Sequence, residues 1–295
     1  MISRACDNRY ALRPESSFRT IATLTLLPVA GLLVFFAWRL LHTAVTTEPG
    51  GGQAVLPVQT PPTSAVTEAA TLPQKPKPTG HIVLIIDDVG HDNQQIERAM
   101  KLDPNINFAV LPNGIRGAEY ARRLYENGFE VLCHLPMEPV GNASPGPNAV
   151  LTSMSEDEIE ALTSANIRAV PFARGVNNHM GSRATADPRV MRSVLRALPR
   201  GMYFIDSRTG GDSVATAMAR QMNIRTASRH VFLDDVPDEA AVRRQIAVLA
   251  AEAQKRGVAV GIGHPHRATL NALALEVPRL RSAGFRFVRA SEAVE

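Results

Sequence analysis

The chain has 295 residues, of which 45% are hydrophobic and 5% aromatic, and its formal net charge is +4. This length allows one large domain or two small ones, and so few aromatic residues argue against a stacking platform for single-stranded nucleic acid. The two cysteines, Cys6 and Cys133, are far apart and form no C-x-x-C pair, which excludes a disulfide scaffold and a cysteine-based zinc cluster.

The first part of the chain predicts a membrane anchor. Residues 21–38 read IATLTLLPVAGLLVFFAW without a charge, which is close to the length that spans a bilayer. Arginines precede this run at positions 4, 9, 13 and 19, and after Arg39 the next basic residue is Lys75. Positive charge stays on the cytoplasmic side, so residues 1–20 are expected to form a cytoplasmic tail and the rest to face outward. A cleaved signal peptide is the alternative, although the run is long for a signal core.

Residues 39–80 predict a disordered linker. Pro, Thr, Gly and Ala dominate there without a hydrophobic period, so the segment cannot bury enough apolar surface to fold. Most of the excess positive charge precedes the folded region, because residues 1–79 hold seven basic and four acidic residues, whereas residues 80–295 hold 25 and 24. The charge therefore indicates membrane topology, and we infer no nucleic-acid partner.

Residues 81–295 predict one α/β domain, because short apolar runs alternate with stretches of helical period. The first expected strand starts at residue 81, and the others lie at 106–111, 129–133, 202–205, 231–233, 258–262 and 285–288. The expected helices lie at 93–102, 116–127, 156–167, 188–198, 214–222, 239–256 and 269–283. This alternation predicts a mostly parallel sheet, either an open doubly wound layer or a closed barrel, and the pattern does not separate the two.

Polar side chains collect where the expected strands end, which is where parallel α/β folds place functional groups. These residues are Asp87, Asp88, His134, Asn177, Asn178, His179, Asp206, Arg208, Asp234, Asp235, His264 and His266. Two adjacent carboxylates repel each other unless a cation or hydrogen-bond donors compensate, so the aspartate pair indicates bound positive charge. We predict that Asp88, His134 and His179 share a metal ion.

The chemistry of these residues predicts a metal-assisted hydrolase. Aspartate and histidine ligands without a thiolate suit a divalent ion such as zinc, which lowers the pKa of its water to about 7 and polarises a carbonyl oxygen. Asp87 is then the candidate general base, and His264 or His266 the candidate acid for the leaving group. Asn177, Asn178 or nearby backbone N–H groups are candidates to stabilise developing negative charge.

The predicted substrate-binding residues are Asn177, Asn178, Asp206, Arg208 and His266. A phosphoryl substrate is a weaker alternative to an acyl one, because the sequence has neither a Gly-rich phosphate loop nor an arginine cluster beside the carboxylates.

Six motifs make the sequence resemble a known family. They read IIDDVG, HLPMEP, GVNNHMGS, FIDSRTGGDSVA, VFLDD and GIGHPHRATL, and their order and spacing resemble the divergent polysaccharide deacetylase family of bacterial envelope proteins. The resemblance covers residues 81–288. It implies a distorted (β/α)7 barrel of the NodB-homology type, which would decide between the barrel and the open layer.

The resemblance also implies roles for single residues. In the Asp-Asp motif the first residue is the base and the second a metal ligand, which corresponds to Asp87 and Asp88. His134 takes the first position of the metal-binding histidine motif, Glu138 stands at its second position, and His179 is our preferred third ligand. The late motif supplies the catalytic histidine, His264.

The resemblance thus implies a zinc-dependent hydrolase that removes acetyl groups from an envelope polysaccharide of the peptidoglycan class. Together with the predicted anchor, it places the protein in a bacterial inner membrane with its domain in the periplasm or outside the cell. The alternative is a weakly active or inactive envelope protein that binds or organises glycan through a relict site, and the altered metal motif favours it.

Overall fold

The computed structural model of the protein describes residues 79–91 and 95–295. The predicted cytoplasmic tail and membrane anchor, and all but the last two residues of the predicted linker, lie outside this part and stay predictions. Within the described residues, none of the helices combines the length and the apolar character needed to cross a membrane.

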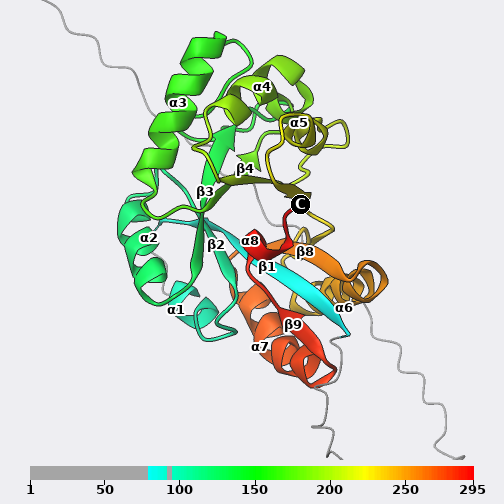
Figure 1. The fold of residues 1–295 in the computed structure, drawn as a ribbon. Coiled ribbons are helices and arrows are strands. Elements are labelled where there is room, and N and C mark those ends of the chain that lie inside the picture. Colours follow the sequence, from blue (N-terminus) through cyan, green and yellow to red (C-terminus); the bar gives the residue numbers. More distant parts are fainter. Residues whose placement is uncertain (1–78, 92–94) are drawn as a thin grey trace, which may run out of the picture. The chain divides into compact units, whose positions relative to one another are not determined.

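Strands and helices alternate along the described chain, and the strands form one parallel sheet (Figure 1). The strands are β1 (Gly80–Val89), β2 (Asn107–Val110), β3 (Glu130–Met137), β4 (Gly175–Met180), β5 (Tyr203–Asp206), β6 (Thr226–Ser228), β7 (Val231–Phe232), β8 (Val258–Gly263) and β9 (Phe285–Phe287). Their order in the sheet is β6-β5-β4-β3-β2-β1-β8-β7, with β9 paired to β1. The parallel α/β architecture is therefore confirmed.

The sheet is a half-barrel of parallel strands, which is consistent with the distorted barrel of the NodB type that the resemblance implied. Strands β6 and β7 stand at the two ends of the strand order, and no ladder joins them within the described residues. They follow each other in the chain, and the two residues between them bond to both sides, since the N–H of Arg229 donates to the backbone oxygen of Asp206 and the N–H of His230 to that of Val260. We call this region, where the chain passes from its pairing with β5 to its pairing with β8, the seam.

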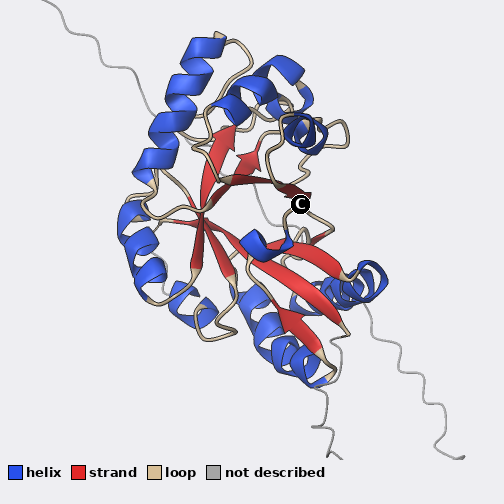
Figure 2. Ribbon diagram, in the orientation of Figure 1, coloured by secondary structure: helices blue, strands red, loops and turns tan. Residues whose placement is uncertain are grey.

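The helices lie on the outer side of the curved sheet, except for the last one, which packs on the inner side through Ala290 (Figure 2). They are α1 (Gln95–Ala99), α2 (Gly117–Glu126), α3 (Glu156–Ala169), α4 (Pro188–Arg196), α5 (Ala215–Gln221), α6 (Glu239–Arg256), α7 (Arg267–Ser282) and α8 (Ala290–Ala293), with a short 3-10 turn at Ala184–Ala186. Every expected helix is present with ends shifted by a few residues. Ser155 and Glu158 form a capping box at the start of α3, and Asp238 caps α6.

Two strands, β4 and β6, were not expected from the sequence. Asn177, Asn178 and His179 were predicted to follow a strand, but they lie inside β4, which pairs along its whole length with β3. The sequence GVNNHM lacks a hydrophobic run because its inward side chains belong to a buried polar network rather than to an apolar core. Strand β6 is only three residues of TAS, too short and too polar to recognise.

The alternation of side chains along each strand produces two hydrophobic cores. In β1, Ile82, Leu84 and Ile86 point outward and pack in the larger core under the helices. Val83 and Ile85 point into the half-barrel, where they join a smaller core from the neighbouring strands. Cys133 points outward into the larger core, and burial raises the pKa of its thiol.

Candidate active site

Alternation along β1 explains how Asp87 reaches the interior. Its side chain follows Val83 and Ile85 on the inward face, and it is buried. Regular alternation would turn the next residue outward. However, the register between β1 and β2 shifts after Ile86, and Asp88 adopts a left-handed backbone with φ of 57°. This conformation costs about 1–3 kcal/mol for a residue other than glycine, and it brings the second carboxylate to the same cavity.

Strands β3 and β4 supply the residues opposite the two carboxylates. His134 follows Leu132 on the inward face of β3. In the parallel ladder Asn177 is in register with His134, and His179 with Pro136, so the imidazole of His179 lies one step further toward the strand ends. The cluster therefore forms because the carboxyl ends of β1, β3 and β4 are close in space, as expected for a parallel sheet.

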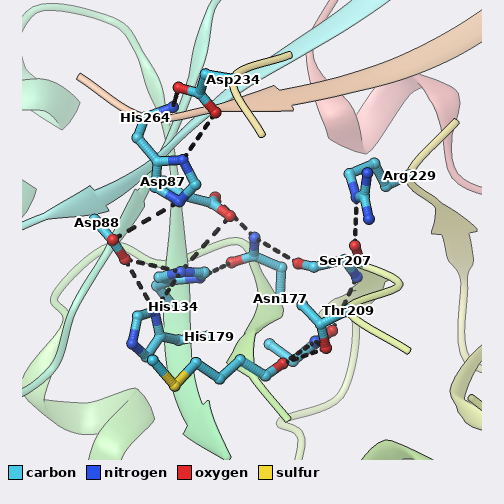
Figure 3. Close-up of polar contacts among 12 residues, drawn as sticks. Asp87, Asp88, His134, Asn177, His179, Ser207, Thr209, Arg229, Asp234 and His264 are labelled. Atoms are coloured by element: carbon cyan, nitrogen blue, oxygen red, sulfur yellow. Dashed lines mark hydrogen bonds and ion pairs between the residues drawn. The ribbon is translucent and has the colours of Figure 1, made fainter. Parts of the chain in front are cut away.

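Asp88, His134 and His179 form a compact triangle of ligand atoms (Figure 3). The Oδ1 atom of Asp88 lies 3.2 Å from Nε2 of His134 and 2.9 Å from Nδ1 of His179, and the two nitrogens are 3.2 Å apart. Ligands bound about 2.0–2.2 Å from one ion lie about 3.0–3.4 Å from each other. The three atoms thus have the spacing of ligands on one face of a divalent cation.

The hydrogen bonding of the triangle also fits a cation. Oδ1 of Asp88 is buried without a hydrogen-bond partner of normal geometry, although two ring nitrogens lie close to it. His134 Nδ1 lies 2.9 Å from the amide oxygen of Asn177, whose Nδ2 donates to Asp87 at 2.9 Å. This chain fixes the proton of His134 on Nδ1, so its Nε2 offers a lone pair to the centre of the triangle.

Electrostatics around the two carboxylates favour positive charge. Burial works against a charged imidazole, but Asp87 and Asp88 nevertheless raise the pKa of His134. For Asp87 burial dominates and raises the pKa of its carboxyl, while the neighbouring histidines oppose the shift. For Asp88 the contacts with His134 and His179 overcome burial and lower the pKa. Asp88 is thus set to stay ionised, and Asp87 is the better proton acceptor.

His264 reaches the cavity from the end of β8. Its Nδ1 lies 3.0 Å from Oδ1 of Asp234, while its backbone N–H and Thr269 Oγ1 both donate to Oδ2 of Asp234. The Nδ1–H of His264 thus donates to the Asp234 carboxylate, and Nε2 faces the cavity, 3.7 Å from Asp88 Oδ2. Burial opposes the charged ring, but Asp234 and the two site aspartates raise the pKa of His264 to about 9.

Asp234 had no role assigned from the sequence. The signals were its position after β7 and its place in the motif VFLDD, and its partner is 30 residues further along the chain. Asp234, His264 and His266 form a second group whose ligand atoms are close enough to hold a cation. In that group Asp234 and His264 already satisfy each other by hydrogen bonds, unlike Oδ1 of Asp88 in the first group.

The predicted substrate-binding residues have different positions. Arg208 lines the cavity of about 530 Å³ that also contains Asp87, Asp88, His134, His179 and His264. Asn178 lines it too, but its amide is engaged with the backbone of Met180 and Ser207. Asn177 is buried in the polar chain described above. His266 is exposed, and its ring stacks on His264 at 5.5 Å.

Asp206 lies on the other side of the sheet. It is buried at the end of β5, where alternation turns it toward α5. Its carboxylate accepts hydrogen bonds from Ser213 Oγ and from the backbone of Arg208. Asp206 therefore positions the loop after β5, and it is absent from the cavity wall.

Glu138, which stands at the second position of the metal motif, is engaged elsewhere. Its Oε2 accepts two hydrogen bonds of 2.6 Å from Thr152, from the backbone N–H and from Oγ1. Its Oε1 lies 3.3 Å from Arg183, and these contacts lower the pKa of the carboxyl against the effect of burial. Glu138 thus ties together the loops after β3 and β4, and His179 takes the place beside His134.

We expect Glu138→Ala to leave metal affinity unchanged and to lower the free energy of unfolding by about 1–2 kcal/mol, because it removes hydrogen bonds to a partly exposed carboxylate. Thermal unfolding and a zinc titration of the purified protein measure the two effects. Glu126→Ala, at an exposed position on α2, is the matched control and should change neither. A weakened metal affinity in Glu138→Ala would make Glu138 a ligand.

Comparison with known proteins gives one family match. Residues 84–294 match the family model described as divergent polysaccharide deacetylase. The uncharacterized protein YibQ of Escherichia coli is 37% identical over 195 residues, which are 66% of this chain and 61% of the E. coli protein. The match thus spans less than two thirds of that relative. A protein of Haemophilus influenzae is 35% identical over 197 residues, 65% of this chain and 69% of the relative.

A solved structure supports the architecture. The crystal structure of an uncharacterized protein from Agrobacterium tumefaciens C58 superimposes with a TM-score of 0.70 at 20% sequence identity. The alignment covers 75% of this chain and 92% of that protein. At this level of identity the similarity concerns the fold alone.

Proposed function

The chain belongs to the divergent polysaccharide deacetylase family, and on this premise we propose that its domain removes acetyl groups from an envelope polysaccharide of the peptidoglycan class. The observation that supports this most directly is the cavity itself. It gathers a buried carboxylate, a triangle of ligand atoms and an aspartate-bound histidine within one space of about 530 Å³. These are the parts that hydrolysis of an acetamide or acetate ester requires.

Asp88, His134 and His179 would hold the divalent cation, with zinc as the proposed metal. When bound there, such a cation lowers the pKa of water and polarises a carbonyl oxygen. Asn177 supports this role from behind, because its amide oxygen orients His134 and its amide nitrogen orients Asp87. One side chain therefore fixes the relative positions of a ligand and the proposed base.

Asp87 is the proposed general base. Its raised pKa makes it a better proton acceptor than an exposed aspartate, and Asn177 holds it in place. As the water oxygen bonds to the acetyl carbon, its proton passes to Asp87. When the bond between the acetyl carbon and the sugar nitrogen breaks, Nε2 of His264 gives its proton to that nitrogen, and acetate and a free amine result. Asp234 keeps His264 protonated and oriented for this step.

The decisive experiment is acetate release by the purified protein. Acetylated peptidoglycan fragments and chitin oligosaccharides would be incubated with the metal-depleted protein and with the zinc-loaded protein. We expect zinc-dependent release of acetate. Glycan binding without any acetate release, with zinc fully bound, would instead favour the alternative of a glycan-binding envelope protein with a relict site.

Replacing Asp234 by asparagine should move the alkaline limb of the pH–rate profile to lower pH by about 1 unit. His264 must be protonated to act as the acid, and loss of the neighbouring negative charge lowers its pKa from about 9. The rate of acetate release, measured from pH 6 to 10, reports the shift. Thr269→Val removes a neutral donor to Asp234 and should leave the limb in place. An unchanged limb in Asp234→Asn would contradict the role of Asp234.

We also propose that the protein is held in a bacterial inner membrane by residues 21–38, with the domain on the outer side. The support is the uncharged apolar run and the arginines that precede it. Labelling of cysteines introduced before and after this run, by a reagent that does not cross the membrane, tests the orientation.

A further inference from the structure

A second cavity, of about 460 Å³, lies along the seam of the half-barrel. Its walls come from β6, from the residues between β6 and β7, from α5 and from the end of α6. We call it the seam cleft. Its charged residues are Arg208, Arg220, Arg229, His230, Glu252, Arg256 and Glu295. Four arginines thus face two glutamates in a space whose volume is within the usual range of ligand pockets.

The arginines are only partly neutralised by the protein. Arg256 pairs with Glu252. Within the described residues, no ion pair or hydrogen bond engages the guanidinium of Arg208 or of Arg220, and both side chains are exposed. Burial lowers the pKa of His230, Arg256 and Arg208 add to this effect, and Glu252 opposes it. The seam cleft is therefore a place of positive potential.

The seam cleft adjoins the candidate active site, because Arg208 and Arg229 line both cavities. Arg229 is fixed there, as its guanidinium donates to the backbone oxygens of Ser207 and Arg208 and lies 4.7 Å from the ring centre of Phe232. Figure 3 shows Arg229 and Ser207 on one side of the site. Arg208 has a left-handed backbone with φ of 47°, held by the bond from its N–H to Asp206. The protein thus builds a rigid cationic wall between the two spaces.

We propose that the seam cleft binds an anionic group of the glycan, a carboxylate or a phosphate carried by a sugar next to the acetylated one, so that the substrate is an acidic polysaccharide. This inference rests on the proposed function, since it concerns the same substrate. Guanidinium groups recognise carboxylate and phosphate with paired hydrogen bonds, and two unpaired arginines beside a fixed third one suit such a group. A neutral glycan would leave this positive charge without a partner.

Binding to the Asp87→Asn protein, which should not turn over its substrate, tests the proposal by calorimetry. The probes are an oligosaccharide that contains N-acetylmuramic acid, the same compound with its carboxylates converted to amides, a 6-phosphorylated N-acetylglucosamine oligomer, and the unmodified oligomer. We expect each anionic probe to bind about tenfold more tightly than its neutral counterpart, and the difference to shrink with salt. The two anionic probes separate a carboxylate preference from a phosphate preference.

Arg220→Gln in the same background should remove most of this difference without changing the affinity for neutral probes. Arg244→Gln, at an exposed position of α6 outside the cleft, is the matched control and should retain it. Equal affinities for charged and neutral probes would overturn the inference, even if the wild-type protein released acetate from both. A charge preference that depends on Arg220, in a protein that releases no acetate, would leave the inference standing and overturn the proposed function.

Discussion

The Asp87→Asn protein should bind zinc as the wild type does and release acetate about 10³-fold more slowly. The amide has nearly the same shape as the carboxylate, and it can still accept the hydrogen bond that Asn177 donates to this position at 2.9 Å. It cannot take a proton from water. The change therefore removes the proposed base and leaves the three ligand atoms untouched. Steady-state rates of acetate release with a saturating acetylated oligosaccharide measure the loss.

The control for this experiment is a partly buried aspartate that does not line the cavity. Asp187 caps α4 by accepting hydrogen bonds from the backbone of Arg189 and Val190, and asparagine is an equally good cap. Asp187→Asn should keep both the rate and the stability of the wild type. A wild-type rate in Asp87→Asn, with zinc bound, would show that the proton of water goes to another group.

Much of the site could be predicted because it obeys the period of β-strands. In β3, the alternation that buries Cys133 under the helices also turns His134 into the half-barrel. The same rule brings Asp87 inside after Val83 and Ile85. Residues at strand ends of a parallel sheet then meet whatever their distance along the chain, so a list of polar strand ends already names most of the cluster.

The rest could not be predicted because it depends on departures from regular structure or on pairings between distant segments. Asp88 was predicted as a ligand from its place at the strand end, but the left-handed backbone and the register shift in β1 that turn it toward the site were not. Asp234 and His264 meet across the β7–β8 pair, and Asp234 alone looks like an ordinary residue at a strand end. Periodicity carries no sign of either arrangement.

The seam is the clearest case of this limit. Arg208, Arg220 and Arg256 come from separate segments, and each alone reads as a solvated residue on a loop or helix surface. They share a cleft only because the fold brings the loop after β5, α5 and the end of α6 together beside β6.

Removing either histidine of the triangle should abolish stable metal binding. We expect His134→Ala and His179→Ala each to weaken zinc affinity by at least about 100-fold. Loss of a residue that only orients a ligand weakens metal affinity by about 10–100-fold, and loss of the ligand itself should cost at least as much. Each variant keeps only two of the three ligand atoms. Asp88 Oδ1, which lies 3.2 Å from Nε2 of His134 and 2.9 Å from Nδ1 of His179, then has a single neighbouring ligand, and two atoms do not define a face of the coordination sphere. Competition with a chromogenic chelator gives the affinities, and elemental analysis of the purified proteins gives the stoichiometry.

Two further variants make this test specific to the triangle. Asn177→Ala removes the acceptor that holds the proton of His134 on Nδ1, so we expect zinc affinity to fall by about 10–100-fold while some metal is retained. His266→Ala changes an exposed histidine of the second group of Asp and His side chains and should leave zinc affinity unchanged. Full zinc stoichiometry and wild-type affinity in both His134→Ala and His179→Ala would overturn the proposed metal site. If His266→Ala alone lost the metal, the ion would belong beside Asp234 and His264, and Asp88 would then be free to act on the substrate.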